Sequence, residues 1–374
     1  MIGVLSLVII IAILLVGTYF YIDSKLGEIR RVAVPALTPE QPGKPIDILL
    51  IGSDSRSFVN NPTQARDFGN TTTYGGQRSD VSIVLRLVPG TSRIEMLAIP
   101  RDLWVHIAGT TGSDKINAAF NSGPNQLVQT IQQDFKIPIN HVMVVNFPGF
   151  AGMVDSLGGI SLDFSMPVRD TMSGLDITQT GCQLLDGQQA LALVRSRHLY
   201  YYEKKAWHYD GMSDWSRIRR QQAFFHALLN RVHTAIPDVF RLNSFLDAAV
   251  TDLTVDSNLS SSEMISLGIK YRSVSSSNLS TTVLPTTPTV INGTDVLLPA
   301  QPYTKATIAT FLAFGASSAP PATTASGSPA KKGHSKSRSA SGGAASTSAS
   351  STPPSDVVTD TPQSLPEPWN PTPC

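Results

Sequence analysis

The sequence contains few cysteines and no recognisable cysteine-based metal motif. Cys182 and Cys374 are the two cysteines among 374 residues, and neither belongs to a C-x-x-C pair or a Cys/His cluster of the kind that holds zinc. A structural metal is therefore not expected. A disulfide between the two cysteines is one open alternative outside the cytoplasm, and two free thiols are the other.

The chain is also poor in charge, since 15% of its residues are charged and the formal net charge is +1. No long-range field draws the whole molecule towards nucleic acid, so we expect no nucleic-acid partner and expect any anion site to be local. The G-x-S-x-G, H-E-x-x-H, Walker A and G-x-G-x-x-G patterns are absent. These absences argue against the common hydrolase, metalloprotease and nucleotide-binding classes.

One uncharged run, residues 2–22, is long enough to cross a membrane. At about 1.5 Å per helical residue it spans a hydrocarbon core of roughly 30 Å. No small-x-small cleavage site precedes Asp23, which favours an uncleaved anchor over residues 1–22 rather than a signal peptide. Because Lys25, Arg30 and Arg31 follow the run, the positive-inside rule taken literally would put the body in the cytoplasm.

Beyond the anchor, composition divides the chain into three parts. Residues 23–45 contain four prolines and predict a linker, residues 46–315 alternate strand-like and helical patterns, and residues 316–374 are rich in Ser, Ala, Thr and Pro and predict a disordered tail. The middle part predicts a layered α-β-α domain with a central mixed sheet. Its predicted strands are 46–52, 81–88, 93–100, 141–147 and 160–164, and its predicted helices are 124–135, 148–157, 187–194, 214–233 and 260–271.

Acidic and basic side chains follow or precede three of these strands. Asp54 comes directly after the first strand, Arg78 and Asp80 precede the second, and Arg101 and Asp102 follow the third. Pro89-Gly90 predicts a hairpin between the second and third strands, which would place Asp80 beside Arg101 at one end of the sheet. Each group alone could be a surface ion pair or a turn; together they suit a divalent cation and an anion that share ligands.

A second group of basic residues lies between positions 195 and 220. Arg217 and Gln221 are four residues apart and share a helical face, with Asp214 suited to the N-cap. A solvated basic face is the simple alternative, but guanidinium groups near a helix N-terminus match phosphate oxygens, and we favour phosphate binding. The five arginines are Arg195, Arg197, Arg217, Arg219 and Arg220.

A Tyr-rich segment, residues 198–209, separates the two halves of this basic group. It contains His198, His208 and Trp207, and a histidine in a loop is more often incidental than catalytic. We interpret the segment as a lid that contacts sugar.

Taken in order, these motifs resemble the LytR-CpsA-Psr family of bacterial cell-wall enzymes, from about Asp47 to about Arg231 and more weakly to Phe314. The matching stretches are DILLIGSDSR, RSDVSIVLRL, IEMLAIPRDLWV, KINAAFNSGP, VNFPGFAGMVDSLGGI, LDGQQALALVRSRH and DWSRIRRQQ. The resemblance implies a single-pass membrane protein facing outward. It also implies transfer of a glycopolymer from an undecaprenyl-pyrophosphate carrier to peptidoglycan, at the 6-hydroxyl of N-acetylmuramic acid.

The resemblance also assigns roles to residues of this sequence. It implies that Asp54 and Asp80 hold Mg²⁺, with Mn²⁺ as an alternative, and that Asp102 orients a neighbouring arginine. Arg78, Asp80, Arg101 and Asp102 would be catalytic. The pyrophosphate would be bound by Arg78, Arg101, Arg195, Arg197, Arg217 and Gln221.

The expected partners are a polyprenyl-pyrophosphate-linked glycopolymer, peptidoglycan and membrane lipid. The predicted helices 124–135 and 214–233, together with the sheet, would supply apolar walls for the polyprenyl chain. Two rival functions remain open: a prenyl-pyrophosphate pyrophosphatase, and a regulatory module that binds the lipid pyrophosphate without turning it over. A transferase can reach a peptidoglycan acceptor only if its folded domain faces outward. The expected location is therefore the outer side of the cell membrane.

Overall fold

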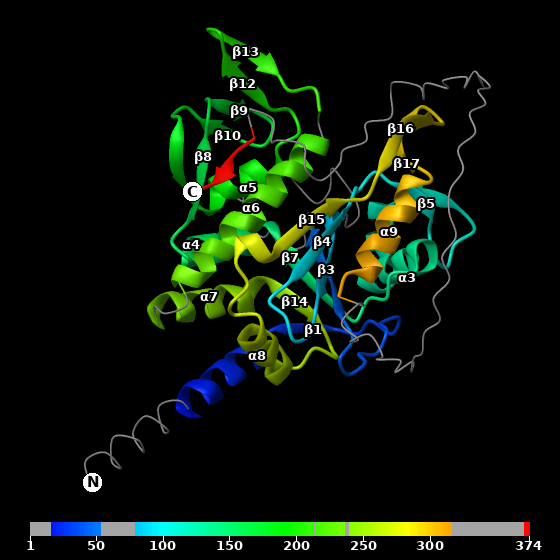
Figure 1. Cartoon of the computed structure of the whole chain (residues 1–374), viewed down its shortest axis with the longest axis vertical. Coiled ribbons are helices and arrows are strands. Elements are labelled where there is room, and N and C mark those ends of the chain that lie inside the picture. Colours follow the sequence, from blue (N-terminus) through cyan, green and yellow to red (C-terminus); the bar gives the residue numbers. More distant parts are fainter. Residues whose placement is uncertain (1–15, 54–78, 213, 236–238, 316–369) are drawn as a thin grey trace, which may run out of the picture.

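A seven-stranded mixed sheet forms the centre of the molecule in the computed structural model (Figure 1), which describes residues 16–53, 79–212, 214–235, 239–315 and 370–374. The four long strands of the sheet and the short strand β8 (Ile160–Phe164) are the five predicted from sequence, and the β3–β4 pair is antiparallel as the Pro89-Gly90 turn indicates. In spatial order the sheet comprises β1 (Arg30–Val32), β14 (Leu253–Asp256), β7 (His141–Asn146), β2 (Ile46–Ser53), β3 (Ser79–Leu87), β4 (Ile94–Ile99) and β15 (Leu279–Val283).

The central strand β2 is apolar on both faces, and this places the sheet between two helical layers. Leu49 and Ile51 point to a core shared with α3 (Pro124–Phe135), whereas Ile48 and Leu50 point to a core shared with helices of the opposite layer. Since successive side chains of a strand alternate between faces, a continuous Ile/Leu run buries both. The predicted α-β-α layering is confirmed.

Most helices lie on one side of the sheet (Figure 1). The helix α5 begins with a capping box, in which Asp186 and Gln189 satisfy each other's backbone N–H groups, and Asn146 caps α4. All five predicted helices are present, within a few residues of the predicted bounds. The helices of this layer are α4 (Phe147–Ser156), α5 (Gly187–Arg195), α6 (Asp214–Ala235), α7 (Val239–Asp252) and α8 (Ser261–Lys270), and α9 (Tyr303–Ala313) lies with α3 on the other.

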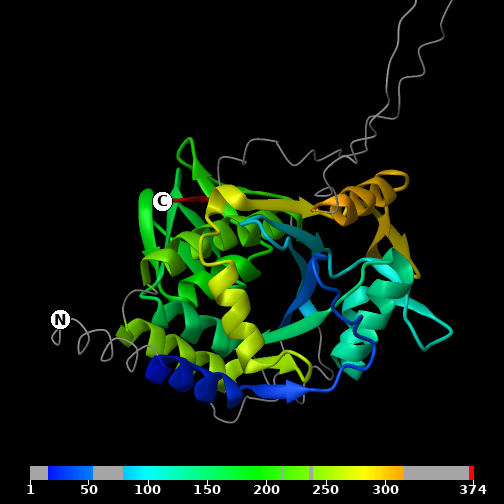
Figure 2. The same ribbon diagram turned by 60° about the horizontal axis from the view of Figure 1, so that its bottom comes forward.

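The segment before β2 is more closely packed than a linker. A helix over residues 16–27 lies along α7 and α8 (Figure 2), and Lys25 Nζ contacts Asp247 Oδ1 at 2.8 Å. The strand β1 then joins the edge of the sheet, parallel to β14, and Val34 is 5% exposed in the core. The prediction of a spacer over 23–45 is therefore wrong for the helix and the strand in this range. The fold buries Ile29 and Val34, although no periodicity in the sequence reveals them.

Most of the predicted anchor, residues 1–15, lies outside the described residues. Within the described part of the chain, no helix has the length and apolar character needed to cross a bilayer. The anchor over 1–22 stays a prediction.

The last five residues return to the domain. The strand β18 (Thr372–Pro373) pairs antiparallel with β8, which also pairs with β11 (Gly181–Leu185), and a disulfide joins Cys182 to Cys374. Of the two alternatives for the cysteines, a disulfide or two free thiols, the structure contains the disulfide. The predicted disordered tail thus ends in an ordered strand, while residues 316–369 lie outside the described part.

A small four-stranded sheet stands at one end of the molecule (Figure 1). Its strands β12 and β13 form an aromatic hairpin that the sequence suggested only as a loop. The sheet comprises β10 (Leu175–Ile177), β9 (Val168–Asp170), β12 (Tyr200–Glu203) and β13 (Ala206–Tyr209). The remaining short elements are β5 (Trp104–His106), β6 (Ser113–Lys115), η2 (Ile116–Ser122), η3 (Ser276–Asn278), β16 (Thr286–Ile291) and β17 (Thr294–Pro299).

Candidate functional site

The ends of β2, β7 and β4 and the start of β3 meet at one edge of the central sheet. Ser53 at the end of β2 lies opposite Ser79 at the start of β3 and beside Asn146 at the end of β7. The end of β4 pairs with the start of β3, where Ile99 faces Ser82. Ligand groups in α/β sheets gather at such carboxyl ends, and the charged residues that flank these strands meet here.

Asp80 and Arg101 form an ion pair at this edge, as the hairpin predicts. Arg101 Nη1 donates to Asp80 Oδ1 at 2.5 Å, and both side chains are 19% exposed. Burial alone would lower the pKa of Arg101, but Asp80, Asp102 and Asp214 together raise it above its ordinary value, so the guanidinium stays charged. The other predicted residues of this edge, Asp54 and Arg78, lie outside the described residues.

Asp102 contacts three cationic side chains. Its carboxylate lies 3.0 Å from Lys115 Nζ, 3.5 Å from Arg101 Nε and 3.8 Å from Arg197 Nη2. Burial would raise the pKa of Asp102, but its contacts with Asp214, Arg101 and Lys115 outweigh that effect and lower it to about 2. Asp102 thus contacts Arg101 and Arg197, and the resemblance implies that it orients a neighbouring arginine, which stays a prediction.

Asp214, the first residue of α6, joins the two halves of the basic group. Its Oδ1 lies 2.8 Å from Arg197 Nε and 3.2 Å from Arg217 Nη2. The Arg217 side chain is 4% exposed, and its Nε–H has no hydrogen-bond acceptor among the described residues. A buried guanidinium donor without an acceptor is costly, and an anionic oxygen is the ligand that would satisfy it.

The segment 195–198 is held in place by the buried carboxylate of Asp170. Its Oδ2 accepts the backbone N–H groups of Arg197 and His198, both at 2.9 Å, and the Ser196 hydroxyl at 2.8 Å. Burial would raise the pKa of Asp170, yet these hydrogen bonds lower it below the ordinary value. Asp170, at the end of β9 in the small sheet, thus fixes the backbone position of Arg197.

Of the remaining arginines in this group, Arg195 faces the site and Arg220 supports it. The Arg195 guanidinium lies over the Phe147 ring, 4.5 Å from its centroid. Arg220 is fully buried, donates to the Ser196 carbonyl at 2.7 Å and lies 3.4 Å from Asp210. Gln221, which was predicted to bind pyrophosphate, donates its Nε2 to the Val194 carbonyl at 3.0 Å and so leaves its carboxamide oxygen for other contacts.

A cavity of about 690 Å³ opens from this cluster into the helical layer. Its polar end is formed by Asp80, Arg101, Arg195, Arg197, Arg217 and Gln221. The rest of its wall is mostly apolar and comes from β2, β3, β7 and the helices α4 to α8, together with Leu26 of the N-terminal helix and Ile29 just after it.

The expected role of residues 124–135 as a wall of this cavity is wrong. The helix α3 packs on the opposite face of the sheet, where Leu127, Val128 and Ile131 are fully buried. Its apolar periodicity is the same as that of α6, so periodicity could not tell which layer each helix joins.

Positive charge exceeds negative charge around the polar end of the cavity. Sequence reasoning missed Lys115 as a site residue, although it opens the matching stretch KINAAFNSGP, and it missed Asp170, which lies in a segment without a recognisable motif. Among the described side chains the cations are Arg101, Lys115, Arg195, Arg197 and Arg217, and the carboxylates are Asp80, Asp102 and Asp214. The site therefore suits a dianionic group attached to a long apolar chain.

Residues 17–311 match the model of the LytR_cpsA_psr family, and the chain belongs to this family. It is 35% identical over 236 residues to the probable cell wall biosynthesis protein LcpB of Corynebacterium glutamicum, covering 62% of this chain and 53% of the relative. It is 32% identical over 212 residues to the polyisoprenyl-teichoic acid–peptidoglycan teichoic acid transferase TagV of Bacillus subtilis, covering 54% and 51%. The chain thus spans little more than half the length of these curated relatives.

Solved structures show the same fold. A LytR-Csp2A-Psr enzyme from Actinomyces oris superimposes with a TM-score of 0.60 at 25% identity, covering 76% of this chain and 95% of that chain. TagV of B. subtilis superimposes with a TM-score of 0.58 at 25% identity, covering 75% and 100%. Family membership, the α/β fold and the charged cavity therefore agree.

Proposed function

We propose that this protein is a phosphotransferase that moves a glycopolymer from an undecaprenyl-pyrophosphate carrier to the 6-hydroxyl of N-acetylmuramic acid in peptidoglycan. The observation that carries the proposal is the continuity between the arginine cluster and the apolar cavity. One end offers guanidinium donors, including the unsatisfied Nε–H of Arg217, and the other offers a long apolar wall. A lipid-linked pyrophosphate has this combination of charge and hydrocarbon. The relatives named as teichoic acid transferases support the same reaction class.

In this proposal the acceptor hydroxyl oxygen attacks the phosphorus that bears the glycopolymer. A new P–O bond forms as the bond to the bridging oxygen breaks, the hydroxyl proton is released, and prenyl phosphate leaves with the bonding electron pair. Phosphoryl transfer depends mainly on positioning and charge neutralisation. Arg101, Arg197 and Arg217, fixed by Asp80, Asp102 and Asp214, would hold the pyrophosphate oxygens and stabilise the charge that develops on them.

The carboxylates at the sheet edge suit a hard divalent cation. Asp80 contacts Arg101 through one oxygen and lines the polar end of the cavity, and carboxylate oxygen is the donor that Mg²⁺ prefers. Asp80 and Asp54 would hold Mg²⁺, with Mn²⁺ as the alternative, and the ion when bound would neutralise pyrophosphate charge. Arg78 would complete the set of phosphate ligands.

We further propose that the acceptor glycan contacts the aromatic hairpin β12–β13. The hairpin leaves the arginine cluster at residue 199 and returns to it at residue 210, where the backbone N–H of Asp210 donates to the Leu199 carbonyl. Tyr200, Tyr202, Trp207 and Tyr209 lie on one face, paired across the strands with ring centroids 5.3 Å apart. Partly exposed aromatic rings beside a catalytic cleft suit the apolar faces of sugar rings.

The proposed substrates also decide the orientation. A peptidoglycan acceptor is accessible only outside the cytoplasm, so we propose a single-pass membrane protein whose body faces outward, despite Lys25, Arg30 and Arg31 after the predicted anchor. The helix at 16–27, which lies beside the apolar end of the cavity, would then keep that end at the membrane surface, where the lipid carrier leaves the bilayer.

The test is transfer of a radiolabelled glycan from a prenyl-pyrophosphate donor to peptidoglycan by the full chain in detergent. We expect Arg217→Lys to reduce transfer by at least a hundredfold, because lysine keeps the charge and loses the fork of donors. Arg219→Lys, two residues away and absent from the cavity wall, is the matched control. Release of free phosphorylated glycan without attachment to peptidoglycan would instead identify a pyrophosphatase, and donor binding without turnover would identify a regulatory module.

A further inference from the structure

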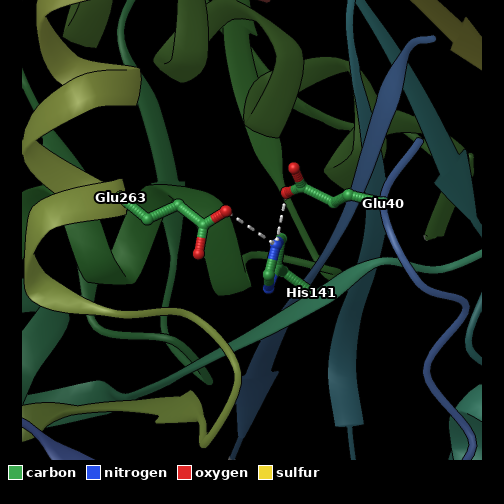
Figure 3. A group of neighbouring side chains, drawn as sticks. All are labelled: Glu40, His141 and Glu263. Atoms are coloured by element: carbon green, nitrogen blue, oxygen red, sulfur yellow. Dashed lines mark hydrogen bonds and ion pairs between the residues drawn. The ribbon is translucent and has the colours of Figure 1, made fainter. Parts of the chain in front are cut away.

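Three ligand-type side chains converge at the end of the sheet opposite the arginine cluster (Figure 3). His141 is the first residue of β7, Glu40 lies in the segment between β1 and β2, and Glu263 lies in the first turn of α8. His141 Nε2 is 2.6 Å from Glu40 Oε1 and 4.0 Å from Glu263 Oε1, and all three ligand atoms lie within 4.8 Å of one another. A strand, a helix and a connecting segment therefore bring the His141 nitrogen and one oxygen from each glutamate close together.

A fourth residue fixes the imidazole ring. Asp256 is fully buried, and its Oδ2 lies 3.1 Å from His141 Nδ1 while it accepts the Val142 backbone N–H at 2.9 Å. Its Oδ1 accepts the backbone N–H groups of Asn258 at 2.9 Å and Leu259 at 3.0 Å. A carboxylate behind a metal-binding histidine sets the tautomer and directs the other ring nitrogen at the ion. The same arrangement here turns Nε2 towards the two glutamates.

The charges at this point do not balance among the described residues. Glu40, Glu263 and Asp256 surround one imidazole, and in the described part of the chain no lysine or arginine forms an ion pair with any of the three. Even a protonated His141 would leave net negative charge.

We propose that His141, Glu40 and Glu263 bind a divalent cation of the Zn²⁺ class, with water in a fourth position. Imidazole nitrogen with carboxylate oxygen is a donor set that zinc accepts, and a tetrahedral ion would bring the ligand atoms to about 3.3 Å from one another. Glu40 and Glu263 are 33% and 31% exposed, which gives the ion a path from solvent, whereas His141 is buried. The absence of cysteine clusters hid this site in the sequence.

The proposed ion would fasten three parts of the chain together. Glu40 belongs to the segment that leads from the N-terminal helix, His141 to the central sheet, and Glu263 to α8, whose residues Met264 and Leu267 line the apolar end of the cavity. The cation would therefore stabilise the apolar end of the cavity, away from the arginine cluster. This proposal stands independently of the proposed function.

The experiment measures zinc binding to the full chain in detergent after removal of metal with a chelator. Zn²⁺ is titrated in competition with a chromophoric chelator, in an Asp80→Asn background that weakens the proposed magnesium site. We expect one Zn²⁺ per chain, no competition from equimolar Mg²⁺, and a rise in Tm on zinc addition. Glu40→Gln and Glu263→Gln should each weaken binding at least tenfold, and Glu203→Gln, an exposed hairpin carboxylate, should leave it unchanged.

Two results would overturn the proposal. One is the lack of saturable zinc binding by the parent chain, which would leave an imidazolium paired with carboxylates. The other is equal affinity in the parent, Glu40→Gln and Glu263→Gln chains, which would place the ion elsewhere. Because the readouts are binding and Tm, neither result depends on whether the chain transfers glycopolymer.

Discussion

The Arg101 guanidinium donates to the Asp80 carboxylate at 2.5 Å across the ends of two neighbouring antiparallel strands. This contact joins a proposed phosphate ligand to a proposed metal ligand, so a change in either residue should alter both functions. The pair lies at the polar end of a cavity whose other end reaches the N-terminal helix. Several consequences of this arrangement can be measured.

Asp80→Asn should raise the Mg²⁺ concentration needed for half-maximal transfer by at least tenfold, because an amide is a weaker ligand for a hard cation than a carboxylate. The measurement is a Mg²⁺ titration of transfer at saturating donor. Asp114→Asn, an exposed aspartate in β6, is the control. An unchanged Mg²⁺ dependence in Asp80→Asn would remove Asp80 from the proposed metal site.

Asp170→Asn should weaken donor binding without removing any residue that contacts the donor. The neutral amide accepts the three hydrogen bonds from residues 196–198 less strongly. The backbone of Arg197 is then held less firmly in position. The pKa of Asp170 is lowered in the folded protein, so its stabilising contribution is present above its unfolded pKa and is lost as the pH falls through the folded value.

The measurement for Asp170 is urea unfolding between pH 3 and 7, together with donor binding at pH 7. The variant should show a flatter loss of stability on acidification than the parent chain. Equal acid dependence in the two chains would mean that the Asp170 carboxylate does not contribute in this way.

Gly268→Phe should discriminate between lipid carriers of different length. Gly268 lines the apolar end of the cavity, and a Cβ placed there meets no atom within 4 Å, so the added ring can enter the open space. We expect a higher KM for a long-chain prenyl donor and an unchanged KM for a short-chain donor. Gly268→Ala is the control for backbone effects, and an equal change for both donors would argue against this part of the cavity as the lipid site.

Trp207→Ser should raise the KM for the peptidoglycan acceptor and leave the KM for the donor unchanged. The Trp207 ring lies over the Arg169 guanidinium at 4.1 Å and pairs with Tyr202, so its loss exposes both and removes one of the four rings on this face of the hairpin. Tyr303→Ser, at the exposed start of α9 in the opposite helical layer, controls for the loss of an aromatic side chain. A selective rise in the donor KM would contradict the assignment of the hairpin to the acceptor.

Cys182→Ser should lower the free energy of unfolding by about 2–4 kcal/mol, the usual contribution of a disulfide that closes a long loop. Cys182 and Cys374 are 192 residues apart, and their bond holds β18 against β8. Unfolding in denaturant with and without reductant measures the difference, which should disappear in the variant. Peptide mapping without reductant should recover the two cysteines in one linked fragment.

Local sequence pattern was enough to predict the main elements of this protein. The Ile/Leu/Val runs at 46–52 and 81–100 predict buried strands, and the turn at Pro89-Gly90 sets their antiparallel pairing. From that register alone Asp80 and Arg101 were expected to meet, because strand pairing fixes which residues share an edge. The arginines around α6 were identified by residue type and helical spacing.

Only the tertiary structure decided which of these residues act together and which support them. Arg217 and Arg220 are neighbours on one helix, yet the first faces the cavity and the second is buried against Ser196 and Asp210. Asp170 and Glu40 carry no local signal, since each gains its role from a partner far away in the sequence. Periodicity and motifs record what a residue requires of its near neighbours, whereas long-range packing selects the face, the layer and the partner.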